Sequence, residues 1–391
     1  MFGFLKGKQK TLTGMDIGSS VVKCLRLDLN QDRPQVTHFA MVDLAPEAIV
    51  DGEIMDRELV IQALRECAEK AGVGKEPVAT AVCGRAVIVK KIVMDKMSAE
   101  DAREAIYWEA EQHVPFDIDD ITLDFQILNE DIGAGQMEIL LVAAKKDMVQ
   151  THAELIRDAG FTPMVIEVAS FANQNAWEFL QEQSPQTADA GDAPSSASPA
   201  DGIDGEFGEE TQDAEAAAEP TAESEFVALL DIGGGVTNVH IVRDGIPYFT
   251  RDLPIGTSQF VEEFQKQLGL TWETANEVAR GHTEEVDSDL VADIVRSVGE
   301  EIFQGLEPSL AYLKNSGEAE GINRIVLSGG GARLPALAAF LAECYGVPSE
   351  IADPLANLDY PPGMFGEEDP QQLSPMLTVS VGLALRKAVS R

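Results

Sequence analysis

The sequence has few cysteines, and none of them is arranged for a covalent or metal framework. Its 391 residues include four cysteines, Cys24, Cys67, Cys83 and Cys344, which lie far apart with no CxxC or Cys/His grouping. Isolated cysteines of this kind predict reduced thiols in a reducing compartment and argue against a disulfide scaffold or a zinc site.

Basic side chains and long hydrophobic runs are also scarce. The 29 Lys and Arg residues face 67 Asp and Glu residues, so the formal net charge is −38, which argues against nonspecific nucleic-acid binding. No apolar run approaches the ~18–20 residues that a membrane-spanning helix needs. The start, "MFGFLKGKQK", lacks a secretion-signal pattern. We expect a cytoplasmic protein in which residues 1–10 form a frayed N-terminal tail.

One segment carries much of the negative charge and little that could form a core. Residues 181–225 contain 13 Asp or Glu residues and no Lys or Arg, within a background of Ala, Ser, Pro and Gly. Such a composition cannot bury enough apolar surface to offset its ordering entropy, so it predicts a disordered acidic linker. The linker divides the chain into two parts.

The two parts begin alike. The first opens with "TLTGMDIGSSVVKCLRLDL" and the second with "FVALLDIGGGVTNVHIVRDG". Each pattern predicts a strand, a D-I-G turn with small residues, and a second strand. This internal repeat indicates two related halves. Elsewhere strands alternate with helices, such as those expected over 57–72 and 98–116, so the sequence predicts an α/β architecture.

The glycines of the two turns suit phosphate binding. Because glycine has no Cβ, backbone N–H groups at such a turn can approach phosphate oxygens closely. A single turn of this kind is more often only a tight turn, and the second copy makes phosphate binding the better interpretation. The candidate phosphate-binding residues are Gly18, Ser19, Ser20, Gly233, Gly234, Gly235 and Thr237.

Three charged residues accompany these turns. Asp16 and Asp231 each end a predicted strand, where a carboxylate would lie beside the phosphates and hold Mg²⁺ through its water molecules. Lys23 follows the first turn and is placed to reach a terminal phosphate. The two aspartates are therefore the candidate metal residues.

A third glycine turn lies in "RIVLSGGGARLPALAAFLAECYG", residues 324–346, which predicts strand, turn and helix. Here Gly329, Gly330 and Gly331 would leave a flat backbone surface on which a base and a ribose can lie. The alternative interpretation is an ordinary strand-to-helix turn.

Taken in order, the three turns resemble the phosphate-1, phosphate-2 and adenosine motifs of the actin/Hsp70/sugar-kinase ATPases. The resemblance implies an actin-like ATPase fold, with two ribonuclease H-like lobes around a cleft that binds ATP and Mg²⁺. Residues 164–176 are similar to the first connecting helix of that fold, which implies that Glu167 lies near the attacking water. Glu167, Asp16 and Asp231 are then the candidate catalytic residues. Residues 374–386 are similar to the closing helix.

A closer resemblance is to the PilM family of type IV pilus assembly proteins, which are related to FtsA. "MDIGSSVVK", "IYWEAEQHVPFDIDDITLDFQIL" and "DLPIGTSQFVEEFQKQLGLTWETAN" carry it. The resemblance covers nearly the whole chain apart from 181–225 and the first ten or so residues. It implies a βαββα subdomain, 1C, inserted over 85–161. The resulting expected division is subdomain 1A from 11–84, 162–180 and 375–391, and a second domain from 226–374.

The family resemblance also implies a function. A member would be a cytoplasmic ATP-binding component of the type IV pilus assembly platform, peripheral to the inner membrane, and its 1C face would bind the cytoplasmic N-terminal tail of PilN. Self-association stays open, and so does hydrolysis, which we expect to be slow at most. The alternatives are an FtsA-like division protein, although no membrane-inserting tail follows here, and an Hsp70-like enzyme with real turnover.

Two local features allow sharper expectations. Tyr107 and Trp108 are adjacent on one predicted helix, so we expect only one to face the core and the other to be available to a partner. The Pro- and Gly-rich stretch 359–375 predicts a solvent-exposed loop.

Overall fold

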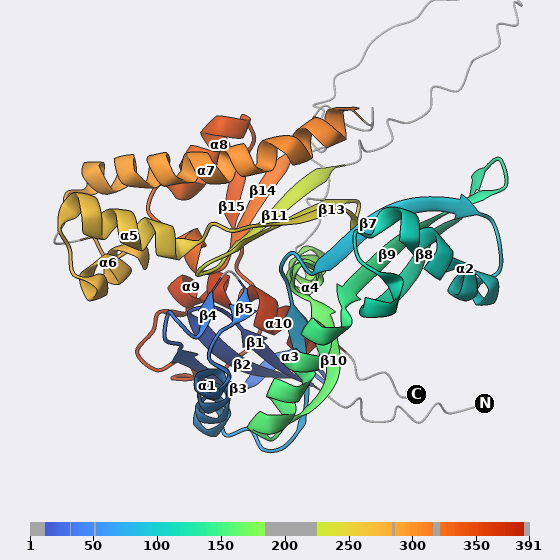
Figure 1. Cartoon of the computed structure of the whole chain (residues 1–391). Coiled ribbons are helices and arrows are strands. Elements are labelled where there is room, and N and C mark those ends of the chain that lie inside the picture. The colour runs from blue at the N-terminus through green and yellow to red at the C-terminus, as the bar shows by residue number, and fades with distance from the viewer. Residues whose placement is uncertain are drawn as a thin grey trace, which may run out of the picture.

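The computed structural model describes residues 12–31, 33–50, 52–183, 225–283, 286–315 and 321–386. The expected N-terminal tail, residues 1–10, lies outside the described residues, as does almost all of the expected linker 181–225. The described chain forms two halves, each built on one mixed sheet, with an inserted subdomain beside them (Figure 1).

The first half contains a five-stranded sheet with the order β10-β6-β1-β2-β3. Its strands are β1 (Thr13–Ile17), β2 (Val21–Asp28), β3 (Gln35–Asp43), β6 (Pro77–Val82) and β10 (Thr162–Val168). The first three are antiparallel to one another, whereas β6 and β10 run parallel to β1. Helix α1 (Arg57–Ala71) packs on one face and α10 (Thr378–Leu385) on the other. A short hairpin of β4 (Ile49–Val50) and β5 (Glu53–Ile54) precedes α1.

The second half repeats this arrangement in the order β13-β12-β11-β14-β15. Its strands are β11 (Phe226–Ile232), β12 (Thr237–Arg243), β13 (Ile246–Leu253), β14 (Arg324–Ser328) and β15 (Ser349–Ile351). Again an antiparallel hairpin leads and two strands follow in parallel. The covering helices are α5 (Thr257–Leu268), α6 (Trp272–Ala279), α7 (Ser288–Asn315) and α8 (Leu337–Tyr345), and η2 (Gly330–Arg333) precedes α8. The predicted repeat is therefore a repeat of sheet topology.

The insert has its own antiparallel sheet, in the order β7-β9-β8. Its elements are β7 (Val87–Asp95), α2 (Ala99–His113), η1 (Ile118–Asp120), β8 (Ile121–Gly133), β9 (Gln136–Lys145) and α3 (Lys146–Ala159), which is the expected βαββα order. As predicted, α2 begins after Ser98, whose Oγ accepts from the Asp101 amide at 3.1 Å.

The prediction that one of two adjacent aromatics on α2 faces the core is wrong. Trp108 is 73% exposed and Tyr107 is 47% exposed. The buried face of α2 is instead the stripe Ala102, Ile106 and Ala110, spaced four residues apart. These small side chains let the helix lie close to the sheet, so neither aromatic ring has room beneath it.

Two connecting helices, α4 (Ala169–Gln183) and α10, pack against each other between the halves (Figure 1). Helix α4 also packs on the second-half sheet, where Trp177 contacts the cluster containing Val227 and Val326. Helix α10 lies on the first-half sheet. The two helices approach so closely that a Cβ on Gly382 would overlap the carbonyl oxygen of Ala172.

The chain returns to the first half earlier than the expected boundary at 374. Leu355, Leu358 and Phe365 pack in one cluster with the first-half strands, and the Val36 amide donates to the Asp359 carbonyl at 2.7 Å. The prediction of an exposed loop over 359–375 is also wrong in part. Phe365 is only 7% exposed, and α9 (Pro370–Leu373) and η3 (Ser374–Leu377) form within the stretch.

The crossing of α4 and α10 generates a stability prediction. Alanine favours a helix over glycine by about 1 kcal/mol, but at position 382 its methyl group would clash with buried backbone that cannot rotate away. Overpacking should prevail, so we expect Gly382→Ala to lower the free energy of unfolding by about 2 kcal/mol or more in urea titrations. Gly74→Ala is the matched control, because an added Cβ there meets nothing within 4 Å. A Gly382→Ala protein as stable as the parent would contradict the packing described.

Candidate functional site

The D-I-G turns of the two halves touch each other. The Gly235 amide, in the β11–β12 turn, donates to Ser19 Oγ in the β1–β2 turn at 3.0 Å. A Cβ on Gly234 would overlap Ser20 Oγ and would lie 2.7 Å from Ser19 Oγ. Glycine at 234 is therefore required for this approach, and the two turns that were singled out from the sequence lie at one place.

A charged cluster lies beneath these turns. Asp16 on β1 is directly opposite Lys23 on β2, and the Lys23 Nζ lies 2.8 Å from Asp16 Oδ2 with both side chains largely buried. Burial alone would lower the pKa of Lys23, but Asp16 and also Asp231 hold it above its usual value. Burial raises the pKa of Asp231 to about 6, and Lys23 opposes that rise. The three residues thus form one electrostatic unit, although they come from both halves.

The second turn is held open by the helix that follows β13. The Thr257 and Ser258 amides, at the start of α5, donate to the Gly233 and Gly234 carbonyls at 2.9 Å each. The helix supplies hydrogen-bond donors that its own first turn leaves unused. This arrangement turns two carbonyl oxygens of the glycine turn toward α5.

The third glycine turn packs against the second. Gly329, with φ of +78°, lies so close to Asp231 that a Cβ there would be 2.5 Å from its Oδ1. Ser328 Oγ donates to the same oxygen at 3.2 Å. A Cβ on Gly331 would overlap Ile232, whereas one on Gly330 would meet only Thr257 Cγ2 at 4.0 Å. Gly330 is therefore the glycine of this turn with open space before it.

Two predicted site residues are engaged elsewhere. The buried Thr237 hydroxyl donates to the Ile255 carbonyl at 2.7 Å. Glu167, 6% exposed at the end of β10, lies 3.0 Å from Arg386 Nη2 and accepts from Asn175 Nδ2 at 3.4 Å. Burial raises its pKa to about 6, and Arg386 and Asn175 oppose the rise. Glu167 contacts none of the Asp16, Lys23 and Asp231 side chains.

The structure adds polar residues that the sequence patterns did not single out. Asn173 on α4 donates to Ser328 Oγ at 3.2 Å, which links the first connecting helix to Asp231. On β13, Asp252 accepts from Asn238 Nδ2 at 2.5 Å and from the Gly84 amide. A prediction of the β11–β12–β13 register would have found Asp252, because Asp231 pairs with Asn238 and Asn238 with Asp252.

Two arginines from the second half lie near the turns. Arg280, which ends α6, lies 3.7 Å from Asp43 at the end of β3, and the neighbouring Leu44 amide donates to the Ser20 carbonyl at 2.8 Å. Arg333 follows the third glycine turn, and its pKa is lowered by burial and by Arg280. Among the described residues its buried Nε has no hydrogen-bond partner, while its Nη1 lies 3.3 Å from Met376 Sδ.

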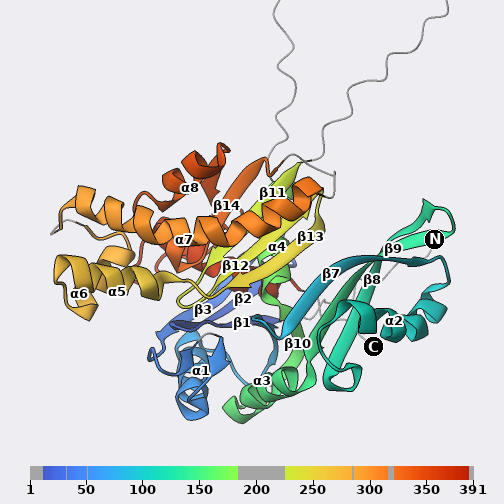
Figure 2. The ribbon, with the colours of Figure 1, turned by 45° about the horizontal axis from the view of Figure 1, so that its top comes forward.

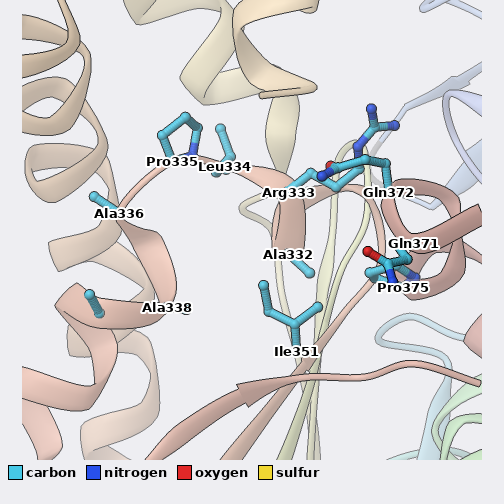
Figure 3. Close-up of a pocket in the computed structure, with 11 residues that line it drawn as sticks. Ala332, Arg333, Leu334, Pro335, Ala336, Ala338, Ile351, Gln371, Gln372 and Pro375 are labelled. Atoms are coloured by element: carbon cyan, nitrogen blue, oxygen red, sulfur yellow. The ribbon is translucent and has the colours of Figure 1, made fainter. Parts of the chain in front are cut away.

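A hollow of about 410 Å³ lies beside the third turn. Figure 3 shows Leu334, Pro335 and Ala336 on one side of it, with Arg333 and Gln372 on the other. Ile351 lines its floor in this view. An apolar wall facing amide and guanidinium groups suits a flat, partly polar molecule.

Comparisons with known proteins point to one family. The model of the family described as type IV pilus assembly protein PilM matches residues 14–192 and 211–388. In its described parts, none of the helices is both long enough and apolar enough to cross a membrane.

Solved structures and curated proteins show similarities of different reach. The chain is 26% identical, with a TM-score of 0.75, to a chain of a PilM-PilN type IV pilus biogenesis complex, over 96% of this chain and 98% of that one. The ethanolamine utilization protein EutJ of Carboxydothermus hydrogenoformans gives 14% identity and a TM-score of 0.50, over 96% and 89%. The cell division protein FtsA of Borreliella burgdorferi is 24% identical over 187 residues, which is 41% of this chain and only 42% of that protein.

These similarities confirm the predicted actin-like α/β fold with its inserted subdomain. The family match extends over both halves and over the insert between them. The chain therefore belongs to the type IV pilus assembly protein PilM family.

Proposed function

We propose that this component of the type IV pilus assembly family binds Mg·ATP between its two halves and that nucleotide state governs its binding to a partner. The observation that carries the proposal is the meeting of the two D-I-G turns above Asp16, Lys23 and Asp231. Each half contributes one turn and one aspartate, so a ligand bound at both turns would bridge the halves. Bridging by a ligand is a direct way to shift the equilibrium between open and closed arrangements.

The residues present suit a triphosphate with its metal ion. The glycines at 18 and 233–235 expose backbone, Ser19 and Ser20 carry hydroxyl donors, and Lys23 supplies a cation. The described residues include no group of three or more side chains that could ligate a metal ion. Mg²⁺ would thus depend on Asp16 and Asp231, water and phosphate oxygens, a set that it commonly accepts. When bound, it neutralises phosphate charge.

The third turn and its hollow suit the remainder of the nucleotide. Gly330 has open space before it, and Arg333 offers a planar cation with an unpaired buried N–H. A guanidinium of this kind can stack on a base or donate to a ribose or phosphate oxygen. We therefore assign the adenosine to Gly329, Gly330 and Gly331.

Hydrolysis is proposed to be slow. In the resting arrangement the Glu167 carboxylate is occupied by Arg386 and Asn175, so it would have to change partners to orient a water molecule. Tight binding of ATP with little turnover is then the expected behaviour, and we keep Glu167 as the proposed water-positioning residue.

The nucleotide site is tested by two substitutions. We expect Asp231→Ala and Gly234→Val each to weaken MgATP binding about 100-fold in calorimetry, because one removes a charged partner and the other fills the contact between the turns. Gly74→Val and Asp244→Asn are controls at an open and an exposed position. Unchanged affinity in the two site variants, with intact folding by circular dichroism, would refute the site.

The role of Glu167 is separable from its structural ion pair. Glu167→Gln should reduce steady-state phosphate release about tenfold or more, because a neutral amide is a poorer acceptor for a water proton. Arg386→Gln breaks the same ion pair but keeps the carboxylate, so phosphate release should persist. Equal loss of release in both variants, in parallel with lost thermal stability, would show that Glu167 acts only in packing.

The proposed partner is the cytoplasmic N-terminal tail of PilN, through which the protein would lie at the inner membrane. Supporting this, the similar solved structure is that of a PilM-PilN complex. The chain also offers two sheet edges, β8 of the insert and β10 of the first half, to which an extended peptide could add. The exposed Tyr107 and Trp108 on α2 provide apolar area close to the β8 edge.

The partner surface is tested with a synthetic PilN tail. If α2 contributes to docking, Trp108→Ala should weaken tail binding about tenfold or more in fluorescence anisotropy, since exposed tryptophans at interfaces often carry large shares of the binding energy. Trp272→Ala is the matched control, because Trp272 is 50% exposed on α6 of the second half. Equal effects of the two substitutions would place the docking surface elsewhere.

A further inference from the structure

The insert touches the second half as well as the first. Its edge strand β7 lies beside β13, the edge strand of the second-half sheet, in both views (Figures 1 and 2). Two contacts define this junction. Lys91 Nζ on β7 lies 4.8 Å from the centre of the Tyr248 ring on β13, and Asp252, near the end of β13, accepts from the amide of Gly84. Gly84 directly precedes the insert.

Polar side chains run across the second-half sheet from the candidate nucleotide site to this junction. Asp231 on β11 is opposite Asn238 on β12, which is opposite Asp252 on β13, so the three side chains share one face of the sheet. Asn238 is 7% exposed, and its amide nitrogen donates to Asp252 Oδ1 at 2.5 Å. Asp252 Oδ2 accepts from Gly84. Its two oxygens therefore bind one group from each half.

A largely buried carboxylate cannot leave its donors cheaply. Moving Asp252 away from either Asn238 or Gly84 would leave a charged oxygen unpaired away from water, which costs more than the loss of a neutral hydrogen bond. The base of the insert is consequently tied to β12, which pairs with the strand carrying Asp231. The Lys91–Tyr248 contact lies farther along β13 and has no such link to the nucleotide cluster.

We propose that Asp252 is a positioning residue that transmits nucleotide binding at Asp231 to the orientation of the inserted subdomain. The inference rests on the proposed function and names its regulation: the carboxylate makes the insert follow the second half when the halves close on nucleotide. Removing either bond of Asp252 should leave a protein that binds nucleotide without the change at the base of the insert.

The test is hydrogen exchange of the full chain with and without saturating MgATP. In the parent protein we expect nucleotide to slow exchange in the peptide 84–95 about fivefold or more, within the usual range of coupling. Asp252→Asn keeps the shape but offers one acceptor where two donors point, so the difference should fall below about twofold. Asn238→Ala, which removes the other bond partner, should do the same and guards against misfolding of a single variant.

Controls separate this inference from its basis. Asp244→Asn makes the same chemical change in the β12–β13 turn, and Tyr248→Leu removes the other contact of the junction, so both should keep the parent difference. If calorimetry shows that the parent binds no ATP, the proposed function and this inference fail together. If ATP binds and Asp252→Asn keeps the full exchange difference, the inference alone is overturned.

Discussion

The structure depends on a buried charge cluster that is not neutral. Asp16 and Asp231 bring two carboxylates to a single ammonium, Lys23, in a place largely shielded from water. One cation cannot compensate two anions, and the rise in the pKa of Asp231 to about 6 expresses that imbalance together with the burial that mainly causes it. A divalent cation with its phosphate oxygens would restore balance. The cluster is thus poorly suited to be only a structural ion pair and well suited to a metal–nucleotide complex.

The halves that supply the two carboxylates are joined by helices that each belong mainly to one of them. Helix α4 is fixed to the second half by Trp177 and by a buried network in which Gln174 Oε1 lies 2.7 Å from His240 Nε2. Burial lowers the pKa of His240 to about 3, so that ring is neutral near pH 7. Helix α10 is fixed to the first half. Relative motion of the halves must therefore be a small sliding of α10 past α4 at Gly382.

The parts of the site that could be predicted are those encoded locally. A strand ending in Asp, followed by glycines and a second strand, defines a turn without any knowledge of the rest of the chain, and the repeat of that pattern revealed both halves. Asp252 could not be found in this way, because its role comes from strand pairing and from the docking of the insert. Nor could the pattern show that the Thr237 hydroxyl is taken by Ile255. The exposure of Trp108 escaped prediction because alanines, not aromatics, form the contact face of α2.

The way the insert joins the first half favours leverage over independence. The chain enters it after β6 and leaves it before β10, and these parallel neighbours have opposite ends at those points. At the exit, Leu155, Ile156 and Phe161 are buried in the first-half core, so that end cannot shift without exposing apolar surface. At the entry, the Gly84 amide is bound by a carboxylate of the second half. A body held to one half at one end and to the other half at the opposite end must rotate when the halves move relative to each other.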